Sequence, residues 1–281
     1  MNVIEHSNVT DYRFDSFHEF VEFAIQHETT YLSASRCTMC STTQWAGGTW
    51  EFARDCLTKG WAGWKSIIDT IDLVPPLVWD NRKKSYFDVC GDEVHPVLYQ
   101  LGLPDCAISR KRVRRAGFKF MKMIVSPGAR AGVRPEDMLN NGIAIVSLIE
   151  SLFTAGIDTE IWYSAPVRSN ISDHCDISIT FPLRKVGSVL DKDIIYYMVS
   201  HPSAFRRIIF SARENLERIT PGIREEMGFI DTCGYGSTVN VVEELFDDAD
   251  IVLDNRKKFY SVEECKTWVQ SEYDSLMNGG A

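Results

Sequence analysis

Residues 117–163 read GFKFMKMIVSPGARAGVRPEDMLNNGIAIVSLIESLFTAGIDTEIWY, and this stretch decides the predicted fold. Its first part, residues 118–125, is an apolar run of strand length that stops at a Ser-Pro-Gly turn. Pro135 and the two acidic residues after it mark the start of a helix, which Gly156 can cap at its end. Residues 157–163 form the next strand. This succession of strand, helix and strand predicts a βαβ unit with parallel strands and a right-handed crossover.

The residues that follow continue the alternation of strands and helices. Residues 175–181 alternate with period two, which predicts a half-exposed strand that Pro182 ends. The remaining expected elements are helices at 191–199, 202–218 and 261–277 and a short strand at 249–253. This order predicts an α/β domain, residues 110–281, around a central, mostly parallel sheet.

The N-terminal third of the chain has aromatic and glycine-rich signals. Helical spacing of apolar residues predicts a helix at 16–27, and Thr49 can cap a second helix that ends near Gly60. Another apolar stripe, residues 61–71, predicts a third helix that a pair of prolines ends. We therefore expect an aromatic-rich helical region, residues 1–109, that packs against the α/β domain.

Four tryptophans stand out in this N-terminal region: Trp45, Trp50, Trp61 and Trp64. Their pattern is typical of side chains that pin a helical hairpin. Exposed tryptophans also favour protein interfaces, and they can stack on sugars or bases. Both interpretations stay open, and under the second the four tryptophans are candidate partner-interface residues.

The composition is that of a folded, soluble chain. Of its 281 residues, 44% are hydrophobic and 25% are charged, which excludes a disordered or collagen-like protein. A membrane helix needs about 18 consecutive apolar residues, and the sequence has no such run. The acidic N-terminus argues against a signal or transit peptide. We expect a cytoplasmic protein that does not contact a membrane.

Eight scattered cysteines are interpreted as reduced thiols that behave mostly as small buried hydrophobes. Cys37 and Cys40 form the one Cys-x-x-Cys pair. Tetrahedral zinc needs four ligands, so His27, Cys56 or the pair His174-Cys175 would have to complete such a site. We expect no metal and no cofactor, with zinc at Cys37 and Cys40 as the open alternative.

One segment is strongly basic although the net charge of the chain is −9. It places seven cations in thirteen residues without an acid: Arg110, Lys111, Arg112, Arg114, Arg115, Lys119 and Lys122. Such a run can have a structural role, as a solvated loop or as an anchor for an acidic face elsewhere in the protein. Alternatively, it can bind the phosphate backbone of a nucleic acid. Arg130 and Arg134 could extend it, because they follow the same strand. Phe118 and Phe120 lie among the lysines; we expect them in the core of the strand, although such aromatics can also stack on unpaired bases.

Other charged and glycine-rich stretches give no catalytic signal. Arg206, Arg207, Arg213 and Arg218 fall on an expected helix beside acidic residues, which predicts a salt-bridged surface. The glycine-rich loop at 234–238 lacks the lysine of a Walker motif. The sequence contains neither a Gly-x-Ser-x-Gly elbow nor a His-Glu-x-x-His motif, so we expect a protein that is not an enzyme.

Several motifs resemble those of uncharacterised proteins encoded by tailed bacteriophages. They are the Trp-x-Gly-x-Thr-Trp element at 45–50 with Gly60-Trp61, and the stretches 91–94, 101–106, 121–125, 141–144 and 155–162. The resemblance covers about residues 14–275. It implies a phage origin, hence action in the cytoplasm of the host, and it implies no activity.

The second half is also similar, in its order of elements, to von Willebrand factor A-like domains. Those domains hold Mg²⁺ with an Asp-x-Ser-x-Ser loop after the first strand. The corresponding loop here, residues 126–130, reads SPGAR and has no carboxylate. The resemblance therefore implies a von Willebrand factor A-like (Rossmann-like) fold, and we do not expect metal-dependent adhesion.

Together these observations predict a non-enzymatic accessory protein of phage transcription or DNA metabolism. Nucleic acid, expected to be single-stranded DNA, would bind to Arg110–Lys122 and Arg130. The single-stranded preference rests on the neighbouring phenylalanines and on the lack of a helix-turn-helix or zinc-finger signature. The alternative is an adaptor or an inhibitor of a phage or host protein, such as a polymerase, that acts through the aromatic N-terminal region.

Overall fold

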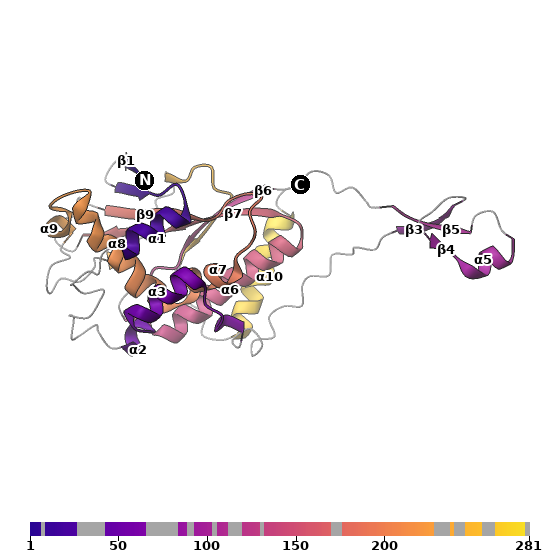
Figure 1. Ribbon diagram of the computed structural model, residues 1–281, viewed down its shortest axis with the longest axis horizontal. Coiled ribbons are helices and arrows are strands. Elements are labelled where there is room, and N and C mark those ends of the chain that lie inside the picture. Colours follow the sequence, from indigo (N-terminus) through magenta and orange to yellow (C-terminus); the bar gives the residue numbers. More distant parts are fainter. Residues whose placement is uncertain are drawn as a thin grey trace.

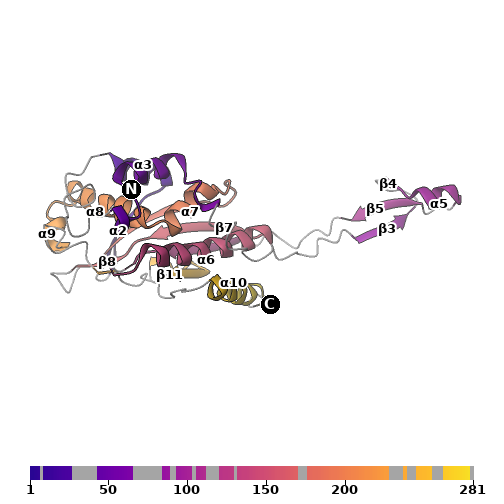
Figure 2. The same cartoon turned by 90° about the horizontal axis from the view of Figure 1, so that it is seen from below.

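A computed structural model gives the fold and describes most of the chain. The described residues are 1–6, 9–26, 43–65, 84–88, 93–102, 106–111, 120–129, 132–169, 176–227, 237–238, 245–254 and 262–278. They form a large eight-stranded sheet with its helices and a small three-stranded sheet with one short helix (Figures 1 and 2).

Strands and helices alternate along most of the chain. The strands are β1 (Asn2–His6), β2 (Val9–Arg13), β3 (Lys84–Asp88), β4 (Glu93–Val94), β5 (Ala107–Lys111), β6 (Phe120–Ser126), β7 (Asp158–Ser164), β8 (Val167–Arg168), β9 (Asp176–Arg184), β10 (Ser237–Thr238) and β11 (Ile251–Asp254). The α-helices are α1 (Phe17–Ile25), α2 (Thr43–Ala46), α3 (Trp50–Lys59), α5 (Pro96–Gln100), α6 (Pro135–Thr154), α7 (Lys192–Ser200), α8 (Phe210–Asn215), α9 (Ile223–Met227) and α10 (Val262–Asn278). A π-helix, η1 (Ala204–Ile209), precedes α8, and a 3₁₀ turn, η2 (Leu216–Arg218), follows it.

The predicted βαβ unit is confirmed. Strands β6 and β7 pair in parallel, with Met123 opposite Ile161, and α6 connects them. Pro135 occupies the first turn of α6, followed by two acidic residues. Gly156 has a positive φ of 81° just beyond the end of the helix, which is the conformation that favours glycine there.

The large sheet is mixed, whereas the sequence predicts a mostly parallel one. Its strand order is β1-β2-β9-β7-β6-β11, with β8 and β10 paired beside β9. Parallel pairs join β11 to β6, β6 to β7 and β2 to β9, while β9 runs antiparallel to β7. Parallel neighbouring strands need a long crossover connection, usually a helix. The described residues between β7 and β9 include no such helix, and β9 runs antiparallel to β7.

The N-terminal region contributes strands that the sequence analysis did not predict. Strands β1 and β2 precede α1, and β2 pairs with β9 from Val9 opposite Asp176 to Arg13 opposite Thr180. The predicted helices at 16–27 and after Thr49 are confirmed as α1 and α3. The large sheet thus draws strands from both sides of the boundary predicted between residues 109 and 110, and that domain division remains a prediction.

Strand β9 also differs from its predicted form. It is buried along most of its length and continues past Pro182 to Arg184. The register with β7 shifts between Ile161 and Trp162, where Trp162 faces Pro182 and Ile161 faces Arg184. Such an irregularity accommodates a proline within a paired strand, because proline has no N–H to donate to the ladder.

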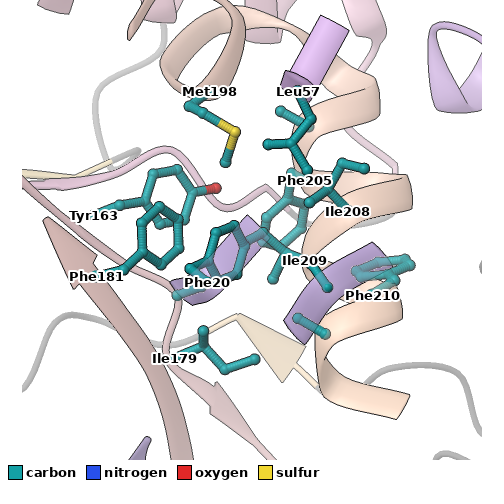
Figure 3. Packing of buried hydrophobic residues seen from close by; sticks show 14 of the residues in the cluster. Phe20, Leu57, Tyr163, Ile179, Phe181, Met198, Phe205, Ile208, Ile209 and Phe210 are labelled. Carbon is teal, nitrogen blue, oxygen red and sulfur yellow. The ribbon is translucent and has the colours of Figure 1, made fainter. Parts of the chain in front are cut away.

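One face of the large sheet carries the helices and the main core. Apolar side chains of β6 and β7 pack with α6, α7 and α10, and those of β9 pack with α1, α3 and α8. Figure 3 shows the centre of the second group, where Phe20 of α1 stacks on Phe181 at 3.7 Å between ring centroids. Tyr163 stacks on Phe181 at 4.8 Å. Three aromatic rings therefore join α1, β9 and β7 in one column.

The opposite face of the sheet has a smaller apolar contact. Ile124 and Trp162 pack there with Phe246 and its neighbours, because side chains alternate between the two faces along each strand. Lys122 fixes the same segment, since its Nζ lies 2.6 Å from the carboxylate of Asp248. Its backbone N–H donates to Asp250 at 2.6 Å.

The small sheet has the strand order β3-β5-β4, and all its pairs are antiparallel. Both views draw this sheet and α5 away from the large sheet (Figures 1 and 2). The three strands and α5 will be called the arm.

Gly142 of α6 lies in close contact with the backbone of α7. A Cβ atom on Gly142 would lie 2.1 Å from the Cα of Ser200 and 2.7 Å from the carbonyl oxygen of Val199. Both contacts are to backbone atoms, which a side-chain rotation cannot move away. The sequence at this position is therefore restricted to glycine by packing.

Gly142→Ala should destabilise the fold by about 1–3 kcal/mol. The helix propensity of alanine acts in the opposite direction by about 1 kcal/mol, but overlap with the α7 backbone outweighs it. Urea unfolding followed by circular dichroism measures the change. Gly132→Ala is the control, because a Cβ at Gly132 meets no atom within 4 Å. A Gly142→Ala variant at least as stable as wild type would contradict this account of the α6–α7 contact.

Candidate nucleic-acid interface

Among the described residues of the basic segment, Arg110 and Lys111 lie on the arm and Lys122 lies on β6. Arg110 and Lys111 are the last two residues of β5. Their partners in β3 are Ser85 and Lys84, respectively. Pairing therefore brings a third cation, Lys84, to this end of the arm. The place of Lys84 opposite Lys111 depends on the register of the two strands.

The register sets two like charges against each other. Residues directly opposite in an antiparallel pair lie on the same face, with Cβ atoms roughly 5 Å apart. The register therefore places cations at both paired positions at this end of the small sheet, Lys84 and Lys111. The residues Arg112, Arg114, Arg115, Lys119 and Arg130 lie outside the described residues.

Lys122 is engaged within the protein. Its ammonium group lies 2.6 Å from both carboxylate oxygens of Asp248 and 5.6 Å from the ring centre of Trp162. The hydrogen bond from Lys122 lowers the pKa of Asp248. Lys122 could contact a phosphate only by giving up this carboxylate, so its main role in the structure is to anchor residues 245–250.

Phe120 is exposed, and the prediction that it belongs to the core is wrong. It begins β6, and 59% of its surface is accessible. Alternation along β6 buries Met121 and Met123 against the helices and leaves Phe120 at the open end of the strand. Phe118 lies outside the described residues. An exposed aromatic ring thus lies, in sequence, between Lys119 and Lys122 of the basic segment.

The four tryptophans make contacts inside the protein. Trp50 is buried in the main core. The ring of Trp61 meets His201 edge-on at 4.7 Å, and Trp64 stacks on Tyr196 at 4.4 Å. The indole N–H of Trp64 donates to Asp193 at 2.6 Å. Trp45, Trp61 and Trp64 keep part of their surface exposed, so a partner interface at this region remains a prediction.

Arginines of η1 hold the glycine-rich element at 45–50 in place. The guanidinium group of Arg206 lies 4.3 Å from the ring centre of Trp45 and donates to the carbonyl oxygen of the same residue. Arg207 donates to the carbonyl oxygen of Gly48 at 3.3 Å. Gly47 has a φ of 77°, and a Cβ there would lie 3.0 Å from Pro202. This motif therefore has a structural role against η1.

Three of these arginines are buried, so the prediction that they form part of a surface is wrong. Arg206, Arg207 and Arg213 are only 2%, 5% and 1% exposed. Arg213 donates to the carbonyl oxygen of Ala165 at 3.3 Å and lies over the ring of Phe205. Their guanidinium groups bind backbone carbonyls between layers of the fold, which helical spacing alone could not indicate. Arg218 is exposed.

A buried polar row crosses strands β2, β9 and β7, and the sequence analysis did not find it. Asp11 accepts a hydrogen bond from Thr180 at 2.7 Å and one from Arg13 at 3.0 Å. Ser178 lies 3.3 Å from Thr180 and 3.1 Å from Ser164, measured between hydroxyl oxygens. Burial raises the pKa of Asp11, and its hydrogen bonds partly oppose this shift. The row is satisfied internally and fixes β2 on β9.

The described residues offer little for metal or thiol chemistry. No group of three or more His, Cys, Asp or Glu side chains among them could hold a metal ion. Cys56 and Cys265 are free and buried, as predicted, and burial raises the pKa of each thiol to about 11. Cys37 and Cys40 lie outside the described residues. No helix in the described ranges is both long and apolar enough to cross a membrane.

The chain belongs to a family described as a domain of unknown function, DUF7192. The family model matches residues 2–270, which include the arm, the basic segment and the tryptophans. No curated protein and no solved structure matches the chain. The family description assigns no activity, so function has to be argued from the residues.

His201 should make the stability of the protein depend on pH. Its ring is enclosed by Phe52, Trp61 and Tyr197, and burial lowers its pKa from 6.5 to about 4. Between these values the unfolded chain binds the proton and the folded protein does not, so stability is complete above pH 6.5 and falls as pH decreases towards 4. The loss due to His201 should be about 3 kcal/mol.

The measurement is urea unfolding of wild type and His201→Gln from pH 4.5 to 7.5. The variant lacks the titrating ring, so its stability should fall less over this range than that of wild type. Equal pH dependence of the two proteins would show that the ring is not kept neutral by burial.

Proposed function

We propose that this protein is a non-enzymatic nucleic-acid-binding protein and that it contacts the phosphate backbone through the basic end of the arm. The observation that carries the proposal is the register that sets Lys84 opposite Lys111, with Arg110 adjacent. A polyanion that binds at this group of cations gains free energy from the release of its own counterions. Such a local patch can bind although the net charge of the chain is −9.

We place single-stranded DNA first among the ligands. Phe120 supports this choice, because an exposed aromatic ring beside a basic run can stack on an unpaired base. A role in phage transcription or DNA metabolism inside the host cell belongs to the same proposal and rests on the resemblance of the motifs. A protein adaptor that uses the aromatic N-terminal region is the alternative.

The von Willebrand factor A-like interpretation also remains a proposal. The unit formed by β6, α6 and β7 supports it, whereas the antiparallel β9 next to β7 is a departure from a mostly parallel sheet. The loop after β6 begins with Ser126-Pro127-Gly128 and has no carboxylate up to residue 130. We therefore propose no metal-dependent adhesion for this domain.

Replacing five cations together should remove most of the nucleic-acid binding. The variant changes Arg110, Lys111, Arg112, Arg114 and Arg115 to Gln and leaves Lys84 in place. At low salt, the variant should bind a labelled single-stranded oligonucleotide much more weakly than wild type does, as measured by fluorescence anisotropy. The slope of log K against log salt should flatten by roughly 0.7 for each lost phosphate contact.

A control variant removes the same charge elsewhere. It replaces exposed cations of the main body by Gln: Lys59, Lys65, Lys185, Lys192 and Arg218. This variant should bind nearly as wild type does. No detectable binding by wild type at low salt would reject the nucleic-acid proposal and favour the adaptor. Equal losses in both variants would show that net charge, rather than the arm, governs binding.

Phe120→Ala tests whether stacking contributes to the choice of single strands. Loss of one stacked base should weaken single-stranded binding by about 1–3 kcal/mol and leave the salt slope unchanged. Duplex binding should change little, because paired bases cannot stack on the ring. Tyr99→Ala removes an aromatic ring that is 68% exposed at the other end of the arm and serves as the control. Equal effects on single strands and duplex would argue against stacking.

A further inference from the structure

The outer edge of β3 is open among the described residues. In the small sheet, β3 is hydrogen-bonded to β5 on one side, and the strand order places it at the edge. Alternate backbone N–H and C=O groups of an edge strand point outward and can pair with another strand. The sequence KSYFD, residues 84–88, contains no proline that would block such pairing.

The charges of β3 suit antiparallel pairing with an identical strand. Lys84 begins the strand, Tyr86 is its centre and Asp88 ends it. When two such strands overlap fully and antiparallel, Lys84 of each lies opposite Asp88 of the other, and the two Tyr86 residues meet on the two-fold axis. Full overlap of the two β3 strands therefore also gives two Lys84–Asp88 pairs of opposite charge.

We propose that β3 pairs with β3 of a second copy of this chain, so that two arms form one continuous six-stranded antiparallel sheet. The symmetry is that of an isologous dimer, in which the same surface of each subunit makes the contact. This interface goes beyond the proposed nucleic-acid function and does not depend on it.

The charge distribution along the whole arm agrees with this arrangement. Residues 85–109 contain no Lys or Arg and four acidic residues: Asp88, Asp92, Glu93 and Asp105. The cations stand at the other end, at Lys84 and from Arg110 onward. A two-fold axis at Tyr86 sets Asp88 of each arm opposite Lys84 of the other.

The two edges of the large sheet lack this complementarity. Full antiparallel overlap of β1 with a second β1 would set Val3 opposite Glu5 and Asn2 opposite His6. The same overlap of β11 would set Ile251 opposite Asp254. Neither pairing brings opposite charges together. Among the edges of β1, β11 and β3, the charge pattern of β3 is the one that suits pairing with an identical strand.

Two single charge reversals and their mixture test the interface. Lys84→Asp leaves two acidic residues at the paired positions of every chain, and Asp88→Lys leaves two cations. Each variant alone should associate at least about tenfold more weakly than wild type in sedimentation velocity, because both cross-strand pairs become repulsive. An equimolar mixture should recover the dimer, because both acidic residues of one variant then face the two cations of the other.

Recovery on mixing separates a lost interface from a misfolded arm, since a misfolded variant cannot restore pairing. Glu93→Lys makes the same charge change as Asp88→Lys, but in β4 and outside the proposed contact, and should associate as wild type does. Wild type that stays monomeric at every concentration up to the millimolar range would overturn the proposal. So would single variants that dimerise normally, or a mixture in which no dimer returns. Because these variants keep Arg110–Arg115, a failed dimer test leaves the nucleic-acid proposal intact.

Discussion

Packing around α6 is the constraint on which the rest of the main fold depends. This helix joins the parallel strands β6 and β7, and its residues from Asn141 to Ile149 are all buried. Such complete burial means that α6 meets the sheet on one side and α7 and α10 on others. Gly142 allows the α7 backbone to come close enough for this arrangement. The remaining helices then extend the same layer over β9 and β2.

The buried charges of the protein hold its layers together. Arg206 and Arg207 bind backbone carbonyls of the segment 45–50, and Arg213 binds the carbonyl oxygen of Ala165, the residue after β7. On the opposite face, Asp11 joins β2 to β9 through Thr180. Buried polar groups cost free energy unless they are hydrogen-bonded, so each of these contacts restricts where the partner segment can lie. These four buried charged residues thus have structural roles.

The arm uses charge in a different way. Its cations gather at one end by strand pairing, and its acidic residues belong to the stretch beyond them. Val94, Tyr99 and Leu101 are exposed on the same unit, whereas Ala107 is buried. A three-stranded sheet is close to the smallest sheet that is stable in water without further packing.

The sequence by itself determined the local elements, because periodicity, caps and turns are properties of neighbouring residues. It predicted β6, α6 and β7, the capping of α3 by Thr49, and a basic run around Arg110. The tertiary structure decided the direction of β9, the place of β1 and β2, and the burial of Arg206 and Asp11. It also decided that Lys84 stands opposite Lys111 and that Phe120 faces solvent. These features depend on strand register and on contacts between residues far apart in the chain, which no local pattern encodes.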